Sequence, residues 1–207
     1  MNLLLRLAVL ALLVLVLGSG CASLSQVERD RAEQVAQQAR STQLSCSQAD
    51  NCALDSPLRA LAGDAFHRSQ PQQPVHFATI LDEGEAALAA RLNLLRSASR
   101  SIDLQTYIFD TDDSARLIID ELLAAARRGV KVRVLIDQLS AITDLQTLGA
   151  LAGAHQNLRL RVYNPSFGKA RLNYFDYAAS VICCFRRFNQ RMHNKLFIAD
   201  NAMGITG

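Results

Sequence analysis

Three residues near the end of the chain have types and a spacing that could do chemistry. His193, Lys195 and Asp200 form the pattern His-x-Lys-x4-Asp. The apolar residues around them predict a strand over 192–199, and side chains alternate between the two faces of a strand. A spacing of two therefore places His193 and Lys195 side by side. A neutral imidazole can attack phosphorus, and a neighbouring ammonium stabilises the negative charge that builds up in the transition state.

Asp200 is out of phase with this pair because it lies an odd number of residues away. Asp200-Asn201 is typical of a two-residue hairpin turn leading into a strand over 202–206. We therefore expect Asp200 to organise the turn and the local charge rather than to touch the reacting atoms. Attack by an imidazole needs no metal ion, and no spacing of histidines and cysteines predicts a zinc site. We expect neither a metal nor a cofactor.

The elements that must position these residues follow from hydrophobic periodicity. Apolar residues recur at helical spacing in some segments and alternate at strand spacing in others. The pattern predicts helices over 83–97, 113–128 and 144–152 and strands over 102–108, 130–136 and 158–163. Helices that alternate with strands indicate an α/β fold with a mixed, mostly parallel sheet and helices on both faces.

Composition bounds the class of protein. The 207 residues are 50% hydrophobic and 20% charged, which excludes a wholly disordered, collagen-like or coiled-coil chain. The formal net charge of +3 is too small to imply nucleic-acid binding. Five cysteines are too few for a disulfide scaffold of this length.

The first residues have the pattern of an export signal. Arg6 is followed by eleven apolar residues, 7–17, about half of what a helix needs to cross a core of roughly 30 Å. Small residues 18–20 then precede Cys21. This resembles a bacterial lipoprotein signal with Cys21 as the lipidated residue, although Gly18 stands where such signals usually carry leucine. The alternative is ordinary cleavage that leaves Cys21 as a free thiol.

Three segments follow from this pattern: a signal peptide over 1–20, a polar and partly helical tether over 21–75, and a catalytic domain over 76–207. An acylated Cys21 would hold the protein at a membrane, facing the periplasm. The lack of an acidic residue after Cys21 slightly favours the outer membrane.

The other cysteines permit different interpretations. In an oxidising compartment Cys46 and Cys52 suit a small disulfide loop, and two unpaired thiols are an equal alternative. Cys183 and Cys184 lie in an apolar run and are typical of core residues. The apolar residues of that run, 174–185, suit either a core or contact with acyl chains.

At its end the chain resembles the phospholipase D superfamily, whose signature is His-x-Lys-x4-Asp-x6-Gly with Gly207 at the last position. Residues 101–137 resemble the first strand, helix and strand of that fold. Asn164-Pro165 and the segment 191–195 resemble the cardiolipin synthase branch. The resemblance covers roughly residues 76–207.

The resemblance implies a mechanism. His193 attacks the phosphodiester of a phospholipid to form a phosphatidyl-histidine, and Lys195 holds the phosphate oxygens. A histidine from a second motif protonates the leaving alcohol. Water then gives hydrolysis, whereas a hydroxyl of phosphatidylglycerol gives cardiolipin. Arg191, beside the motif, is a further candidate for substrate binding.

The second motif is absent from this chain. None of the other three histidines is followed two residues later by lysine; they are His67, His76 and His155. We expect the chain to be one of two halves of the fold. The second motif would then come from a region beyond Gly207 or from another copy across a two-fold axis. The isolated chain should have little activity.

Two alternatives to a cardiolipin-synthase-like enzyme remain. One is a homodimeric phosphodiesterase or endonuclease with a single motif in each subunit. The mild net charge and the expected anchor count against it, and the favoured interpretation includes no nucleic acid. The other is a catalytically incomplete lipoprotein. The absent second motif favours it, and the intact His193 and Lys195 count against it.

Overall fold

A computed structural model describes residues 25–107, 112–140 and 145–207 of the chain. The expected signal peptide, Cys21 and Ile108 lie outside these ranges. At the centre is a five-stranded sheet with the order β3-β2-β1-β4-β5. Its strands are β1 (Ser101–Thr106), β2 (Lys131–Asp137), β3 (Leu158–Tyr163), β4 (Leu196–Ala199) and β5 (Met203–Thr206).

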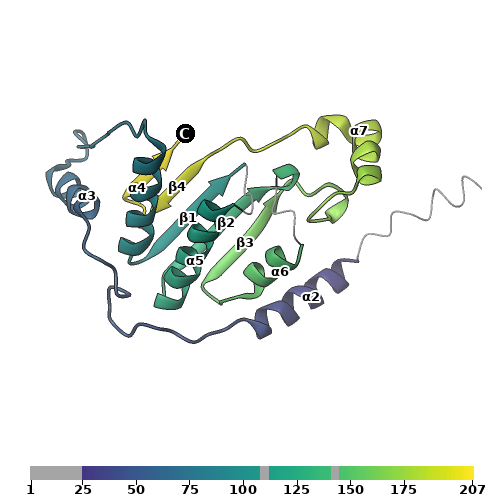
Figure 1. Cartoon of the computed structure of the whole chain (residues 1–207), viewed down its shortest axis with the longest axis horizontal. Coiled ribbons are helices and arrows are strands. Elements are labelled where there is room, and N and C mark those ends of the chain that lie inside the picture. The colour runs from purple at the N-terminus through teal and green to yellow at the C-terminus, as the bar shows by residue number, and fades with distance from the viewer. Residues whose placement is uncertain (1–24, 108–111, 141–144) are drawn as a thin grey trace, which may run out of the picture.

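The pairing of the strands confirms the mixed, mostly parallel sheet. β1 pairs with β2, and β2 with β3, in parallel, whereas β4 runs antiparallel to both β1 and β5. Four of the five strands therefore point in one direction and β4 points against them. Figure 1 shows β1, β2 and β3 ending at the same edge of the sheet, where the yellow chain leading into β4 also passes.

One face of this sheet is covered by α4 (Gly84–Ser97), α5 (Asp113–Arg128) and α6 (Leu145–Gly153). The strands contribute alternate residues to the core, as a half-buried strand should. The fully or almost fully buried side chains include Leu94, Leu95, Ile102, Leu122, Val132, Ile136, Phe197 and Ala199. Burial of this apolar surface is the main force that holds the helices to the sheet.

The opposite face of the central strands is polar. Arg133, Arg159 and Arg161 are exposed there, and Arg133 forms an ion pair with Asp103 of the neighbouring strand. In the part of the chain that the structure describes, this face of β2 and β3 is therefore open to solvent at its charged positions. The α/β class is confirmed. The expected helices on both faces are not found in the described residues: α4, α5 and α6 all pack on one face, because the other face of β2 and β3 carries charged side chains.

The segment ahead of the domain contains α2 (Gln26–Ala39) and α3 (Pro57–Arg68) and follows the surface of the domain between them. The amide of Ser45 donates to the carbonyl of Arg127 at 2.8 Å, and the amide of Leu54 donates to that of Arg96 at 3.0 Å. These backbone bonds fix the segment against the carboxyl ends of α5 and α4.

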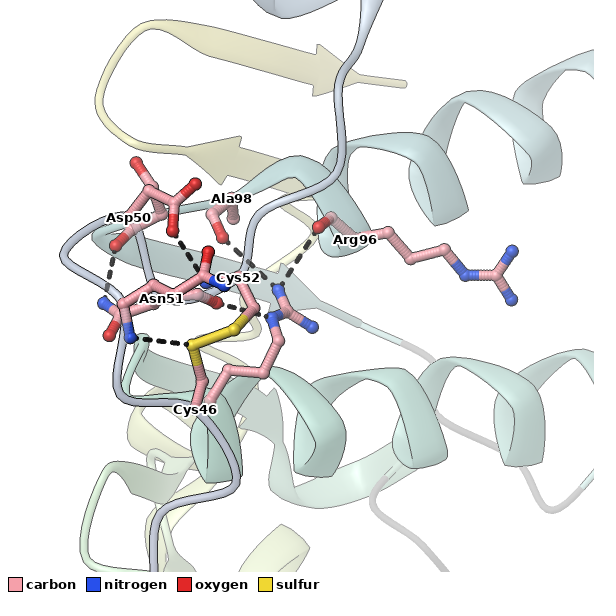
Figure 2. The surroundings of a disulfide bond; sticks show 9 residues. Cys46, Asp50, Asn51, Cys52, Arg96 and Ala98 are labelled. Carbon is pink, nitrogen blue, oxygen red and sulfur yellow. Dashed lines mark hydrogen bonds between the residues drawn. A yellow bond between two sulfur atoms is a disulfide. The ribbon is translucent and has the colours of Figure 1, made fainter.

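Between those two bonds lies a small loop closed by a disulfide from Cys46 to Cys52 (Figure 2). The Asn51 side chain donates to the carbonyl of Ser99 at 2.8 Å, and the guanidinium of Arg128 donates to the carbonyl of Asn51 at 3.1 Å. Arg128 also donates to carbonyl oxygens at the end of α4. The loop therefore joins the ends of α4 and α5 to the start of β1.

The second cysteine pair differs from the sequence expectation. Cys183 and Cys184 lie in α7 (Tyr174–Phe188), where both are exposed and joined to each other. Their expected burial in a core is wrong because α7 turns the apolar part of its surface outward.

We predict that Gly129→Ala destabilises the fold. Gly129 ends α5 at a φ of 112°, and an added Cβ would lie 2.5 Å from Oδ1 of Asn51. Strained backbone of this kind costs about 1–3 kcal/mol. Urea unfolding monitored by circular dichroism measures the loss. Gly63→Ala in α3 is the matched control, because nothing lies within 4 Å of its Cβ. Equal stability of the two variants would contradict the prediction.

Candidate active site

His193 and Lys195 lie at the carboxyl edge of the parallel strands, which is where open α/β sheets bind ligands. Tyr107 follows β1, Asp137 ends β2 and Asn164 follows β3. The chain of residues 190–195 passes this edge before it enters β4. Residues from four separate segments are thus brought together.

His193 and Lys195 are both exposed at this edge. The ring of His193 lies against that of Tyr107, with ring centroids 4.2 Å apart in an edge-on arrangement. Next to it, the side-chain amide of Asn194 donates to the side-chain oxygen of Gln105 at 3.3 Å. The carbonyl of Lys195 accepts from the amide of Gly207 at 3.2 Å, which extends the pairing of β4 and β5 by one residue.

The strand that carries the motif is shorter than expected. β4 begins at Leu196 rather than at residue 192, so His193 and Lys195 lie in the chain just ahead of it. At the expected first residue of this strand, the amide of Met192 donates to the carboxylate of Asp137 at 2.9 Å. A backbone amide bonded to a side chain is not available to the strand ladder.

Asp137 and Arg191 form an ion pair beneath the motif. Asp137 is fully buried, the Arg191 side chain is only 9% exposed, and Nη1 of Arg191 lies 3.1 Å from Oδ1 of Asp137. The same carboxylate accepts from the amide of Leu139 at 2.9 Å. Arg191 also lies over the ring of Phe188, 5.0 Å from its centroid. The pair fixes the chain two residues ahead of His193.

Substrate binding by Arg191 stays a prediction. Its guanidinium is engaged with Asp137 rather than standing exposed beside His193, although Nε and Nη2 have no hydrogen-bond partner within the described ranges. Sequence analysis missed Asp137 altogether. One feature of the sequence could have indicated Asp137: it is an acidic residue at the end of a strand of alternating valines. A carboxylate that is buried at such a position must find a partner.

Asn164 fixes the same segment from the other side. Its side-chain amide donates to the carbonyl of Arg187 at 2.7 Å and to that of Gln190 at 2.9 Å. The residue adopts a left-handed conformation with a φ of 46°, which asparagine tolerates better than most residues. The end of α7 and the start of the motif segment are thus both tied to the loop after β3.

Asp200 lies at the other end of β4. Because β4 is antiparallel to β1, Asp200 meets the amino end of β1, seven residues or roughly 23 Å of extended chain from His193. Its carboxylate accepts from the amides of Ser99, Arg100 and Ser101 at 2.7–3.0 Å and from the Ser99 hydroxyl at 2.9 Å. Asp200 therefore holds the hairpin to the sheet.

The turn itself differs slightly from the expected one. Asp200 and Asn201 both have positive φ, 54° and 55°, as a type I′ turn requires. Pairing resumes between Ala199 and Met203, so three residues rather than two connect the strands.

Burial tends to raise the pKa of the Asp200 carboxyl. The hydrogen bonds from the backbone of Ser101, Ser99 and Arg100 outweigh this effect of burial, and the pKa of Asp200 lies below its ordinary value.

Within the described ranges no three histidine, cysteine, aspartate or glutamate side chains are grouped to hold a metal ion. A cavity of about 510 Å³ has no lining residue from the motif segment; its lining residues are Asp55, Ser56, Pro57, Arg59 and Ala60.

With this geometry in hand, comparison with known proteins decides the family. Residues 92–207 match the family model described as "Cardiolipin synthase, PLD-like domain", where PLD stands for phospholipase D. The chain belongs to this family. The match includes the motif, Asp137, Asn164 and Asp200, whereas the Cys46–Cys52 loop precedes the matched range.

Two curated relatives are similar in sequence to this chain. An uncharacterized protein of Helicobacter pylori strain J99 is 39% identical over 153 residues, which cover 73% of this chain and 30% of that protein. Cardiolipin synthase C of Escherichia coli K12 is 38% identical over 127 residues, covering 61% of this chain and 26% of that protein. The chain thus spans less than a third of the length of these relatives.

Two solved structures also resemble the PLD-like domain. NucT from Helicobacter pylori is 22% identical, with a TM-score of 0.38, over 56% of this chain and 62% of that one. The phospholipase D family member Nuc from Salmonella typhimurium is 23% identical, with a TM-score of 0.33, over 55% and 57%.

We predict that Asp200→Asn lowers stability most near neutral pH. A carboxyl whose pKa is lower in the folded state stabilises the fold above its unfolded pKa, and this contribution is lost as the pH falls through the folded pKa. The difference in unfolding free energy between wild type and Asp200→Asn should therefore narrow as the pH falls into the acid range. Asp64→Asn, at an exposed pair with Arg68, is the control. A difference independent of pH would contradict this account.

Removing one partner of the buried pair should cost more than removing both. Asp137→Ala leaves the Arg191 guanidinium buried and unpaired, which costs about 3–5 kcal/mol. The double variant Asp137→Leu/Arg191→Met replaces the pair by apolar groups and should recover much of that stability. Urea unfolding of both variants tests this, and a double variant that is no more stable than Asp137→Ala would contradict the prediction.

Proposed function

We propose that this protein is a phosphodiesterase of phospholipids that works through a covalent phosphohistidine and transfers a phosphatidyl group in the manner of a cardiolipin synthase. Its family supports phosphodiester chemistry in general. The observation that carries the proposal is the exposed His193 and Lys195 at the carboxyl edge of the sheet, held from below by the buried pair of Asp137 and Arg191.

The proposed reaction has two steps. His193 attacks phosphorus, a P–N bond forms, and the P–O bond to the headgroup alcohol breaks. Lys195 stabilises the charge on the phosphate oxygens as it develops. In the second step water or a hydroxyl of phosphatidylglycerol attacks the same phosphorus, which releases His193 and gives phosphatidic acid or cardiolipin.

The leaving alcohol needs a proton from a second histidine, which this chain does not offer at the site. His155 is 1% exposed and its Nε2 is bonded to the carbonyl of Gln43, so it has a structural role. We propose that the second motif comes from a further region of a longer protein or from a second copy of the chain. The exposed polar face of β2 and β3 leaves room for a further region of the protein or for a second copy of the chain.

The proposed substrate also fits the proposed location. A lipidated Cys21 would place the domain at the periplasmic side of a membrane, with the outer membrane slightly favoured. In the residues that the structure describes, no helix is both long and apolar enough to cross a bilayer.

A substrate with a good leaving group isolates the step that this chain can perform alone. p-Nitrophenolate leaves as a stable anion, so the first step then needs no general acid. With phosphatidyl-p-nitrophenol we expect a burst of p-nitrophenol equal to the amount of chain, and an acid-labile phosphoryl group on His193. His193→Ala should reduce the rate of p-nitrophenol release in the burst at least about a thousandfold. His76→Ala should leave this rate unchanged.

The p-nitrophenyl ester of thymidine 5′-phosphate provides the second arm. A larger burst with this ester would overturn the preference for lipid and favour the nuclease alternative. The absence of a burst with both esters would contradict the proposed function.

A further inference from the structure

Helix α7 turns its apolar residues away from the protein. Six large apolar side chains on it are exposed, among them Tyr174 at 94%, Phe175 at 87% and Ile182 at 86%. The side toward the domain instead carries Ser180, which is 1% exposed, and the half-buried Asp176. A helix of a soluble domain normally shows the reverse distribution. The six exposed residues, here called the α7 stripe, are Tyr174, Phe175, Tyr177, Val181, Ile182 and Phe185.

The exposure of the α7 stripe is not caused by a loose helix. At the start of α7, Asn173 caps the amide of Asp176, and Lys169 forms an ion pair with Asp176 at 2.7 Å. Near the end, Phe188 is buried between the ring of Tyr177 and the guanidinium of Arg191. Figure 1 shows α7 at the periphery, beyond the carboxyl edge of the sheet. The helix has a kink at Cys184, where φ is −143°, and it is fixed by its polar side and by its ends.

The charges around the α7 stripe are cationic. Asp176 is the only acidic residue of α7, and Lys169 neutralises it. Arg186 and Arg187 are exposed in the last turn, directly after Phe185. An aromatic and aliphatic stripe with arginines at its border is the composition of helices that lie in the interface of anionic membranes.

We propose that α7 lies flat on an anionic lipid surface, with the α7 stripe inserted among the upper parts of the acyl chains. This inference rests on the proposed function, because it names how the site reaches its substrate. His193 follows Phe188 by five residues, at most about 17 Å of extended chain. Asn164 and Arg191 fix that short segment to the end of α7. A helix held at the surface keeps His193 near the phosphates of the headgroups.

Two other occupants of the α7 stripe are outcomes of the test: a second copy of the chain, and another part of a longer protein. We favour lipid because the arginines border the stripe and no unpaired acid interrupts it in the described residues of α7. Insertion among acyl chains buries aromatic and aliphatic groups of any shape, whereas a protein partner would need a matching apolar surface.

The absence of tryptophan from the sequence provides a direct experiment. Phe175→Trp places a single reporter on the α7 stripe, and Phe66→Trp places one on α3, where Phe66 is 65% exposed. Each variant of the full chain is mixed with vesicles of phosphatidylglycerol or phosphatidylcholine whose acyl chains carry bromine, a contact quencher. Circular dichroism verifies that both variants are folded.

With phosphatidylglycerol we expect the Phe175→Trp emission to shift to the blue and fall roughly twofold or more, because an interfacial helix reaches ~5–10 Å into the bilayer boundary. Phosphatidylcholine should quench less. Arg186→Gln/Arg187→Gln in the same background should reduce the difference between the two lipids. The Phe66→Trp emission should change little.

Three results would overturn the inference. Equal quenching of both reporters would mean that the chain is held near the vesicle by another segment. A blue emission that depends on protein concentration before lipid is added would mean that a second copy covers the α7 stripe. No quenching at all, with an emission independent of protein concentration, would remove lipid as the occupant and favour another part of a longer protein. The burst with phosphatidyl-p-nitrophenol dispersed in detergent tests the proposed function separately, since it needs no bilayer.

Discussion

The carboxylate of Asp137 is the constraint on which the site depends. It is buried at the end of β2, so it needs partners, and it finds them in the guanidinium of Arg191 and the amides of Met192 and Leu139. Two of these three partners belong to the segment that leads into the motif. The requirement to satisfy one buried charge therefore determines where His193 enters the edge of the sheet.

A second polar centre fixes the opposite edge. The amides of Ser99, Arg100 and Ser101 converge on Asp200, and the carbonyl of Ser99 accepts from Asn51 in the loop closed by Cys46 and Cys52. The amino end of β1 is thus held by the hairpin on one side and by the disulfide loop on the other. The carboxylates of Asp137 and Asp200 thus position β4, one at each end. Neither belongs to the pair of His193 and Lys195 that we assign to the chemistry.

Periodicity predicted the strands and helices α4, α5 and α6 well because their core side chains recur at regular spacing, whereas α7 was not predicted as a helix. The alternating valines of β2 and the stripe of α5 are examples, and the structure contains both. The predicted start of β4 was wrong, and its first expected residue, Met192, is instead bonded to Asp137, 55 positions away in the chain. Local spacing carries no information about such a partner.

The same reason explains the outward face of α7. Apolar residues at helical spacing indicate that one face will be covered, but they do not say by what. Lys169 and Asn164 draw the polar side and the end of the helix to the domain, and these contacts come from the loop after β3. The disulfide of Cys46 and Cys52 was one of two equal alternatives, because sequence alone does not give the distance between two thiols.

The central claim is that His193 and Lys195 jointly hold a phosphate ester at the carboxyl edge of the sheet. A crystal structure of the chain with vanadate, an analogue of the phosphoryl transition state, tests it most directly. We expect vanadium bonded to a ring nitrogen of His193, with Nζ of Lys195 donating to a vanadate oxygen and Arg191 still paired with Asp137. Vanadate bound elsewhere, or the two side chains turned to opposite sides of the chain, would contradict the account.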